Sequence, residues 1–432
     1  MRKKACTRRL CVTVICIIGV LSAGRATADE SAAADPYGYS RSRLTGDWNG
    51  ARNELADKGV TVNVDVLQSL QGVVDGGIEK DWKYGGSVDY EFSFNFEKLG
   101  LWPGASIDIR LEQQFGEFIN TDTGSILAVN TDGLFPLPDY HEPTLSKLVF
   151  TQFLSESFAV MLGKIDTIDG DNNHFAGSRG RTNFMNQNLV FNPVAIRTAP
   201  YSSLGAGAVF FFPNAAAPRP TTLAFTVRGA DGQPNTAGWD DDFRSGTGYA
   251  IELSHPTNFF DKSGNHLFGG TYGDKDYTAL DPDARMILRR LRGLGTAPKK
   301  EGSWCFYYNF HQYLFTEQSD PTQGWGVFGR FGIADDETSP IEDFYSIGLG
   351  GKGLIDGRDQ DRWGVGYFLA GLSDELPAGV RELYGDSQGW EAFYNIEITP
   401  YLQITPDVQI IDPGRKDQDS GLMLGVRGRM LF

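Results

Sequence analysis

Cysteine is scarce in this 432-residue chain and nearly absent beyond its first segment. Three of the four cysteines lie within residues 1–28, and Cys305 is the fourth. A chain that retains only Cys305 cannot form an intramolecular disulfide. Its stability therefore has to come from other interactions.

Long apolar runs are also lacking. After residue 28 no apolar stretch reaches the roughly 20 residues that a membrane-spanning helix needs, and the run at 10–20 (LCVTVICIIGV) is about half that length. This run follows a basic start and precedes Ala26-Thr27-Ala28, which supplies small residues for a cleavage site. We therefore predict that residues 1–28 are a secretory signal peptide. Cys16 lies behind Ile15 rather than behind a small residue, which does not fit a lipoprotein.

Basic residues are few outside this segment. Residues 1–28 contain six of the 39 basic residues and none of the 55 acidic residues, which leaves 33 basic residues and a formal net charge of −22. This acidity argues against nucleic acid as a partner. An exported chain of this kind is destined for the periplasm, the outer membrane or the medium.

Helix-length amphipathic segments are rare. The main candidate is 44–59 (LTGDWNGARNELADKG), where we expect Asp47 to cap a short helix and Gly59 to end it. The chain contains 53 glycines, and 12% of its residues are aromatic. This composition favours an all-β protein.

What the chain does contain is alternation with a period of two. In DYEFSFNFE (89–97) the aromatic residues occupy one face, and polar or acidic residues occupy the other. In ASIDIRLEQQF (105–115) aliphatic residues alternate with Asp108, Arg110 and Glu112. Such strands have two faces that require different environments.

The last twelve residues, GLMLGVRGRMLF (421–432), show the same pattern. Leucine, valine, methionine and Phe432 share one face, whereas Arg427 and Arg429 share the other. Either the apolar face packs on a core and the arginines meet bulk water, or the apolar face meets lipid and the arginines line an aqueous interior.

Strand-like segments recur along the whole chain without a linker or an internal repeat. Beyond 60–66, 89–97, 105–115 and 421–432, they lie at 158–165, 221–228, 248–254, 304–315, 324–333, 344–352, 362–371, 390–399 and 401–411. At about 25 residues for each strand with its connection, about 16 strands fit. Closure into a barrel would also pair the terminal strand and leave no exposed edge.

We therefore predict an all-β fold, a closed antiparallel transmembrane β-barrel of about 16 strands formed by residues 60–432. Residues 29–59 would form an N-terminal segment with the short helix. The alternative is a secreted β protein, but a soluble sandwich rarely needs charges at several consecutive inward positions.

Three motifs resemble catalytic or ligand-binding sites but lack the required context. GDSQG (385–389) would make Ser387 a nucleophile, yet a strand-like segment follows it and no later histidine exists. GLGGKG (348–353) is not followed by a helix that could hold a phosphate. Asp169 opens a segment with the spacing of a calcium loop, but later positions do not fit, so only a weak ion site remains as an alternative. No catalytic residue, cofactor or metal site is predicted.

Five segments together resemble one known family, the carbohydrate-selective porins of the OprB type. They are LTGDWNGARNELADKGV, GKIDTIDGDNNHFAG, TNFMNQNLVFNP, GLGGKGLIDGRDQDRWGVGY and EAFYNIEITPYLQITPDVQIIDPG. They occur in the family's order and span nearly all of the chain from Leu44 to Phe432. The sequence departs from the family at Asn49, where Gly is frequent.

The resemblance implies a single-chain 16-stranded barrel in the outer membrane of a Gram-negative bacterium. It implies passive diffusion of monosaccharides and other small sugars through a water-filled pore. Phe432 resembles the carboxy-terminal residue that the barrel-assembly machinery recognises. The expected partners are small sugars, outer-membrane lipid and that machinery, and the protein would be a monomer or a homotrimer.

The expected pore lining consists of charged residues on the inward faces and in one long connection. These residues are Asp108, Arg110, Glu112, Arg179, Arg181, Arg427 and Arg429. The long polar segment 166–200 either folds inward and narrows the pore or forms an ordinary exposed loop. Two other functions stay open: a less selective porin for cations or other small solutes, and a non-conducting barrel or adhesin.

Overall fold

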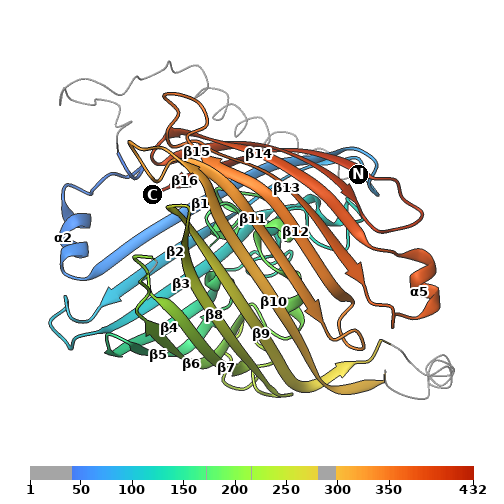
Figure 1. Cartoon of the computed structure of the whole chain (residues 1–432), viewed down its shortest axis with the longest axis horizontal. Coiled ribbons are helices and arrows are strands. Elements are labelled where there is room, and N and C mark those ends of the chain that lie inside the picture. Colours follow the sequence, from blue (N-terminus) through green and yellow to red (C-terminus); the bar gives the residue numbers. More distant parts are fainter. Residues whose placement is uncertain (1–40, 172, 216, 281–297) are drawn as a thin grey trace, which may run out of the picture. The chain divides into compact units, whose positions relative to one another are not determined.

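The computed structural model describes residues 41–432 except 172, 216 and 281–297. The predicted signal peptide lies outside the described residues. Sixteen antiparallel strands form a closed barrel in which each strand pairs with the next one along the chain, and β1 pairs with β16 (Figure 1). The predicted fold class and strand number are confirmed.

The strands are long enough to cross a membrane when tilted. Their bounds are β1 (Val60–Asp75), β2 (Trp82–Asn95), β3 (Ala105–Gly116), β4 (Thr144–Ser155), β5 (Phe158–Asp166), β6 (Ser202–Phe212), β7 (Thr221–Gly229), β8 (Thr247–Phe259), β9 (Lys262–Thr278), β10 (Lys299–Thr316), β11 (Gly324–Ala334), β12 (Ile341–Lys352), β13 (Arg362–Leu372), β14 (Ser387–Thr399), β15 (Leu402–Asp412) and β16 (Gly421–Leu431).

In the described residues, helices lie in the connections between strands and in the segment before β1. They are α2 (Ala51–Asp57), α3 (Gln187–Val190), α5 (Ala378–Leu383) and the single-turn helices η1 (Ile119–Thr121), η2 (Thr131–Leu134), η3 (Ile168–Gly170), η4 (Ser178–Gly180) and η5 (Pro193–Arg197). Across the described part of the chain, no helix is long and apolar enough to span a bilayer.

Three strands escaped the sequence-based prediction. In β4 a bulge shifts the register, because Arg110 pairs with Lys147 whereas Leu111 pairs with Leu145, and this shift breaks the period of two. The central part of β6 (LGAGA) carries almost no polar residues, and β9 is interrupted by glycines. In each of these three strands a different local feature hides the alternation of polar and apolar residues.

The two faces of β1, β2 and β3 separate as predicted. Val64 pairs with Tyr90, which pairs with Leu111, and these apolar side chains share one face. The adjacent row is acidic: Asp65 pairs with Asp89, which pairs with Glu112 on the interior face. All three acids are buried. Like charges directly opposite each other are unfavourable, so this row needs cations nearby.

The opposite wall corrects the simple division into a lipid-facing apolar face and an ionic lumen. On β11 to β14, Phe328, Phe344, Phe368 and Phe393 point inward and are at most 5% exposed. The outward face of the same strands is apolar as well, and Ile347 on β12 is 51% exposed. Both faces of these strands are therefore largely apolar.

The N-terminal helix is shorter than predicted, and the cap is wrong. The helix α2 begins at Ala51 after Gly50 in a left-handed conformation, and no side chain caps it. Asn49 also has a positive φ of 57°, which asparagine tolerates better than most residues. Gly59, with φ of 92°, ends the turn after the helix as expected. Asp47 instead accepts hydrogen bonds through its backbone oxygen from Gly50 and Arg52.

The terminal residues are integrated into the barrel seam. The backbone N–H of Phe432 donates to Val64 O at 2.9 Å, and that of Leu44 donates to Leu431 O at 2.8 Å. Arg52 of α2 donates from Nη1 to Phe432 O at 3.2 Å. The chain therefore ends in a paired strand rather than a frayed one.

Candidate functional site

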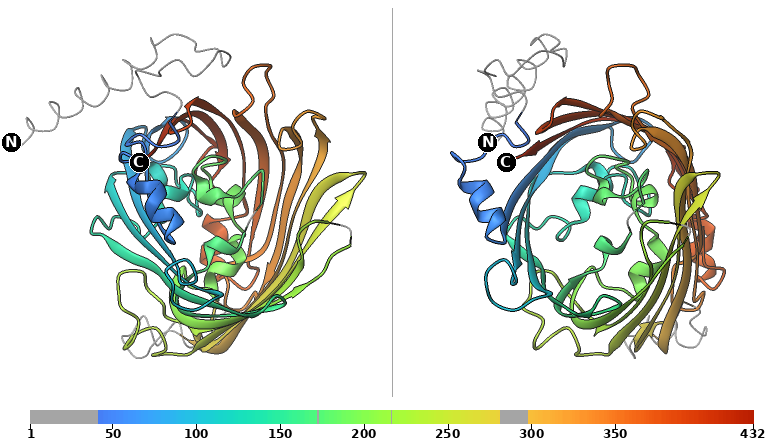
Figure 2. Two further views of the ribbon diagram at one scale, coloured as in Figure 1. Left: turned by 90° about the vertical axis from the view of Figure 1, so that its left-hand side faces the viewer. Right: turned by 60° about the vertical axis from the view of Figure 1, so that its left-hand side comes forward.

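The connection between β5 and β6, residues 167–201, lies inside the ring of strands (Figure 2). We call it the inner segment. Asparagine side chains shape its turns: Asn173 accepts from Phe175 N at 3.0 Å, Asn186 from Asn188 N at 3.0 Å, and Asn192 from Val194 N at 3.4 Å. Short amide side chains mimic a backbone turn in this way. The richness of this segment in asparagine thus reflects its turns.

Inward-facing glycines let the inner segment approach β11, β12 and β13. A Cβ atom at Gly350 would lie 2.7 Å from Phe175 Cβ, and one at Gly366 would lie 2.8 Å from a methyl carbon of Leu189. Both distances are shorter than a carbon contact allows. Gly350 of GLGGKG and the two glycines of WGVGY therefore make room for the inner segment.

Arg330 of β11 fixes the backbone of the inner segment to this wall. Its guanidinium is fully buried and donates to the carbonyl oxygens of Leu189, Val190 and Ala176, each at 2.9 Å. It also donates from Nε to Asp171 at 2.8 Å. The sequence analysis missed this residue. The available signal was a single arginine at an inward position of the otherwise apolar strand WGVFGRFGIA.

Glu391 of β14 provides the complementary anchor. Its carboxylate accepts from the backbone N–H groups of Met185 at 2.5 Å and Asn186 at 2.9 Å. Arg427 of β16, a predicted pore-lining residue, donates to Gly180 O, and to Asn183 O at 2.7 Å. Arg427 is 1% exposed, so its guanidinium holds the inner segment.

Two arginines of the inner segment compensate the acidic row. Arg179 pairs with Glu112 at 2.5 Å and with Asp166 at 2.6 Å. Arg181 pairs with Asp65 at 3.2 Å and contacts Asp89. The structure thus brings the predicted residues Glu112, Arg179 and Arg181 together. The inner segment supplies the cations that the acidic strands require.

Arg110 and Arg429 complete the network from the strands. Arg110 donates from Nη1 to Asp166 at 2.8 Å and to Asp169 at 2.9 Å, and from Nε to Glu91 at 3.1 Å. Arg429 donates from Nη2 to Asp65 at 2.7 Å. Charges of both signs therefore alternate around one side of the lumen.

Asp169 of η3 is the point where several cations meet. Lys147 lies 2.9 Å from its carboxylate, in addition to Arg110 and Arg179. Burial alone would raise the pKa of Asp169, but these three cations hold it well below its ordinary value. Asp169 is therefore ionised over the whole physiological pH range. Its carboxylate is paired with protein cations, and Asp171 is paired with Arg330.

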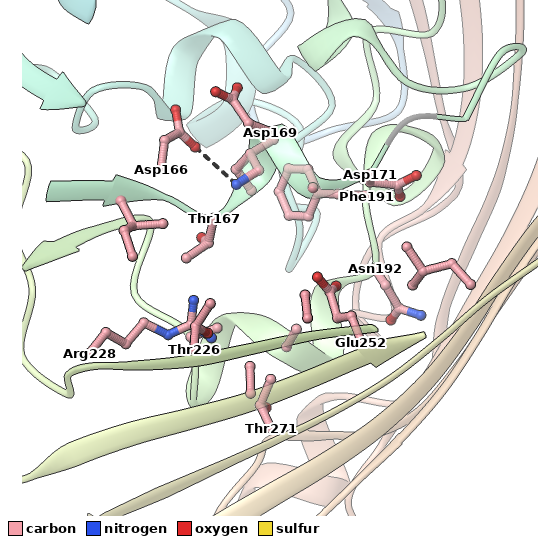
Figure 3. A pocket seen from close by; sticks show the side chains of 18 of the residues that line it. Asp166, Thr167, Asp169, Asp171, Phe191, Asn192, Thr226, Arg228, Glu252 and Thr271 are labelled. Atoms are coloured by element: carbon pink, nitrogen blue, oxygen red, sulfur yellow. Dashed lines mark hydrogen bonds between the residues drawn. The ribbon is translucent and has the colours of Figure 1, made fainter. Parts of the chain in front are cut away.

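Among the cavities that the described residues line in the interior, four bear on the site. The outer cavity, about 650 Å³, is lined by long connections, including residues 126–127, 134–137 and 230–234. The central cavity, about 390 Å³, is lined by the inner segment and by strands β3 to β5 and β7 to β10 (Figure 3). The terminal cavity, about 340 Å³, is lined partly by Arg43 and Leu431 from the two ends of the described chain. The side cavity, about 140 Å³, adjoins β1 to β4.

Neighbouring cavities share lining residues and therefore adjoin one another. Ile196 lines both the outer and the central cavity. Asp169 and Asp171 line both the central and the terminal cavity. Asp108, a predicted pore residue, lines the central and the side cavity and accepts from Ser93 Oγ at 2.7 Å.

The family model described as "Carbohydrate-selective porin, OprB family" matches residues 79–432. The chain belongs to this family. The match covers β2 to β16 completely, and with them the inner segment, Arg330 and the facing acidic residues Asp89 and Glu112, whereas Asp65 on β1 lies outside it.

Curated relatives of this OprB-family porin carry porin names. The chain is 24% identical to Porin B of Pseudomonas aeruginosa over 31% of its own length and 33% of the relative. It is 27% identical to Porin AaxA of Chlamydia pneumoniae over 26% of its own length and 29% of that relative. These two matches span about a third of each relative. The putative porin QuiX of Acinetobacter baylyi is 20% identical over 96% of this chain and 99% of its own length.

Solved structures resemble the fold of the porin. The high-pH structure of Pseudomonas putida OprB matches with a TM-score of 0.78 at 18% identity, over 91% of this chain and 99% of that one. The low-pH structure of the same protein has a TM-score of 0.58 at 15% identity. Together with the family, the barrel indicates the outer membrane of a Gram-negative bacterium as the location of this porin.

Proposed function

We propose that this porin allows passive, selective diffusion of monosaccharides and other small sugars across the outer membrane, after cleavage of a signal peptide at residue 28. The observation that supports this function best is the row of interior cavities of which neighbours share lining residues, with charged side chains gathered where the central and the terminal cavity adjoin. Short turns of such barrels face the periplasm and long connections face outward. The outer cavity is then the entrance, and the terminal cavity is the exit.

The narrow part of the path lies at Asp169 and Asp171, which line the cavities on both sides. Around it stand Arg110 and Arg179, and the terminal cavity adds Arg181 and Arg429. We assign the predicted residues Asp108, Arg110, Glu112, Arg179, Arg181 and Arg429 to this constriction and its support. Arg427 contributes to the constriction indirectly, because its guanidinium holds the backbone of the inner segment.

A lining with both signs of charge suits sugars for a physical reason. A sugar that enters a narrow pore loses part of its hydration shell, and fixed donors and acceptors replace those hydrogen bonds. Carboxylates accept from hydroxyl groups and guanidinium groups donate to them. Because most charges at the constriction are paired with each other, a neutral polar solute meets no net barrier there.

A less selective porin for cations is the second candidate. The formal net charge of −22 for residues 29–432 favours cations over anions by attraction at the pore mouths. The close pairing of Asp169, Asp65 and Glu112 with arginines works against this selectivity within the lumen. A non-conducting barrel or adhesin is the third candidate, and the adjoining cavities inside the barrel argue against it.

Conductance measurements test this function. Purified protein in planar bilayers is expected to form open channels whose current is reduced by glucose, and to different extents by other mono- and disaccharides. Channels with strong cation preference and no sugar block would support the second candidate. Absence of conductance from correctly folded protein would contradict any porin function.

The remaining partners follow from the same proposal. Lipid surrounds the outward apolar faces, and Phe432 is the residue by which the assembly machinery recognises the chain. The unit is a monomer or a homotrimer. Crosslinking of the detergent-purified protein distinguishes the two.

A further inference from the structure

Arg228 of β7 differs from the arginines that hold the inner segment. Arg110, Arg179, Arg181, Arg330, Arg427 and Arg429 each contact a carboxylate or a backbone carbonyl. Arg228 is only 4% exposed, yet within the described residues its guanidinium forms no ion pair, and its buried Nε has no hydrogen-bond partner. A buried donor without a partner is costly, so this group calls for an acceptor from outside the chain.

The surroundings of Arg228 leave room for it to face the central cavity. Its register partners on both neighbouring strands are glycines, Gly205 on β6 and Gly248 on β8. A Cβ atom at Gly205 would lie 2.9 Å from Arg228 Cβ, and one at Gly248 would lie 3.5 Å from its Cγ. Because neither glycine has a side chain, there is space for the Arg228 side chain between β6 and β8. Arg228 lines the central cavity.

A second unpartnered group lies beside it. Thr226, two residues earlier on β7 and therefore on the same face, also lines the central cavity. Its Oγ1 is buried and has no hydrogen-bond partner within the described part of the chain. Figure 3 shows Arg228 and Thr226 projecting into the same space. One strand thus presents a guanidinium and a hydroxyl group to one cavity.

Other parts of the cavity lining carry acceptors and amides. Glu252 of β8 accepts a hydrogen bond from the Tyr307 hydroxyl at 2.6 Å, and Asn192, Asn309 and further hydroxyl groups line the cavity as well. Glu252 and Arg228 face the same cavity without forming an ion pair (Figure 3). Carboxylate, amide and hydroxyl groups in this number suit a ligand with several hydroxyl groups.

We propose that the central cavity is a binding site for a monosaccharide-sized sugar acid, a compound with one carboxylate and several hydroxyl groups. Arg228 and Thr226 bind the carboxylate, and Glu252, Asn192 and Asn309 bind the hydroxyl groups. An anion makes charge-assisted hydrogen bonds with a guanidinium, which are stronger than those of a neutral hydroxyl. The volume of about 390 Å³ lies at the small end for ligand sites, which excludes long oligosaccharides. This proposal rests on the porin function proposed above.

Solute block of single-channel current tests this site. Glucuronate, glucuronamide and glucose have similar size, but only glucuronate carries a carboxylate at neutral pH. At an ionic strength of about 0.1 M, where screening is modest, we expect glucuronate to reach half-maximal block at a concentration about tenfold lower than glucose or glucuronamide. Equal half-blocking concentrations for all three solutes would overturn the proposal.

Variants assign the effect to the residues named. In Arg228→Gln the half-blocking concentration of glucuronate should rise about tenfold, whereas that of glucose should change less than about threefold. Arg228→Lys should give an intermediate value, because it retains the charge without the planar fork. Thr226→Val should shift glucuronate by a smaller amount. Arg244→Gln, which removes an arginine from an exposed connection, should leave both values unchanged.

The outcomes separate this proposal from the porin function itself. Block by glucose without preference for glucuronate contradicts the sugar-acid site alone. Open channels that neither solute blocks contradict both sugar proposals, and a protein that opens no channel contradicts all of them. Equal shifts for glucose and glucuronate in Arg228→Gln would show a general change of the pore and would also overturn the site. If Arg228→Gln does not fold, the half-blocking concentrations of glucuronate and glucuronamide in the wild type decide whether the proposal holds.

Discussion

The two sides of the lumen use the same strand geometry for different tasks. On β11 to β14 most inward positions are glycine or phenylalanine, and the inner segment packs against them with Phe175, Phe184 and Leu189. On β1 to β3 a row of inward carboxylates pairs with the arginines of the inner segment. The apolar wall fixes the inner segment, and the charged wall, together with β4 to β10, leaves space for solutes. The inner segment therefore has two chemically different faces, an apolar one toward β11 to β14 and a basic one toward β1 to β3.

The largest effect is expected when the inner segment is detached from the apolar wall. Arg330→Ala removes four hydrogen bonds and leaves Asp171 and three carbonyl oxygens without their donor. Truncation of a buried, hydrogen-bonded charge costs about 3 to 5 kcal/mol. We expect a lower unfolding temperature in detergent, protease cleavage within the inner segment and a larger single-channel conductance.

The matched control is Arg244→Ala, because Arg244 forms only an exposed ion pair with Asp241. It should behave like the wild type. If Arg330→Ala kept the wild-type conductance and protease resistance, the apolar wall would not be what fixes the inner segment.

Overpacking the same wall should have a smaller effect. In Gly350→Leu the new side chain begins 2.7 Å from Phe175 Cβ, an atom that cannot move without the backbone. Such overpacking typically costs about 1 to 3 kcal/mol. The unfolding temperature should fall accordingly. Gly379→Leu on α5 is the control, since no heavy atom lies within 4 Å of its Cβ position.

On the charged side of the lumen, Asp132 gives rise to a predicted pH dependence of stability. This carboxyl lies in η2, accepts from Ser87 Oγ at 2.5 Å, and its burial raises its pKa to about 6. Because its pKa is higher in the folded than in the unfolded chain, the folded state binds the proton more tightly. Stability should therefore rise as the pH falls through about 6 and level off near the unfolded pKa of about 4.

The expected gain is on the order of 2 kcal/mol between pH 7.5 and 4.5. Unfolding temperatures measured across this range for the wild type and Asp132→Asn check it, because the variant should lack this part of the pH dependence. Asp240→Asn, at an exposed position, should retain the wild-type profile. Identical profiles for the wild type and Asp132→Asn would contradict the prediction.

The smallest predicted effect concerns ion selectivity at the constriction. Asp169→Asn removes one negative charge between the central and the terminal cavity while Arg110, Arg179 and Lys147 remain. The permeability ratio of potassium to chloride should fall about twofold. Reversal potentials in a salt gradient measure this ratio. An unchanged ratio would place the conducting path away from Asp169.

The fold was largely predictable from local alternation. Tyr90, Phe92 and Phe94 on one face with Asp89 and Glu91 on the other suffice to define a strand and its orientation. The pattern fails where a bulge shifts the register, as at Lys147 in β4. The pattern also fails where a glycine replaces a patterned residue because a side chain from a distant part of the sequence needs the space.

The site was only partly predictable, because partners depend on tertiary contacts. Glu112, Arg179 and Arg181 could be proposed as lumen residues, but their pairing joins positions about 70 to 116 residues apart. Arg330 stands alone in an apolar strand, where a single polar residue forms no pattern. The inward phenylalanines of β11 to β14 looked no different from lipid-facing ones, because both environments are apolar.

The inner segment continues directly into β5 at one end and into β6 at the other, and these two strands are hydrogen-bonded neighbours. Unlike a plug carried by a separate domain, it is covalently attached at both ends to neighbouring strands and cannot diffuse away from the barrel. Any widening of the passage is therefore limited to movement of a segment whose two ends stay fixed in the barrel wall.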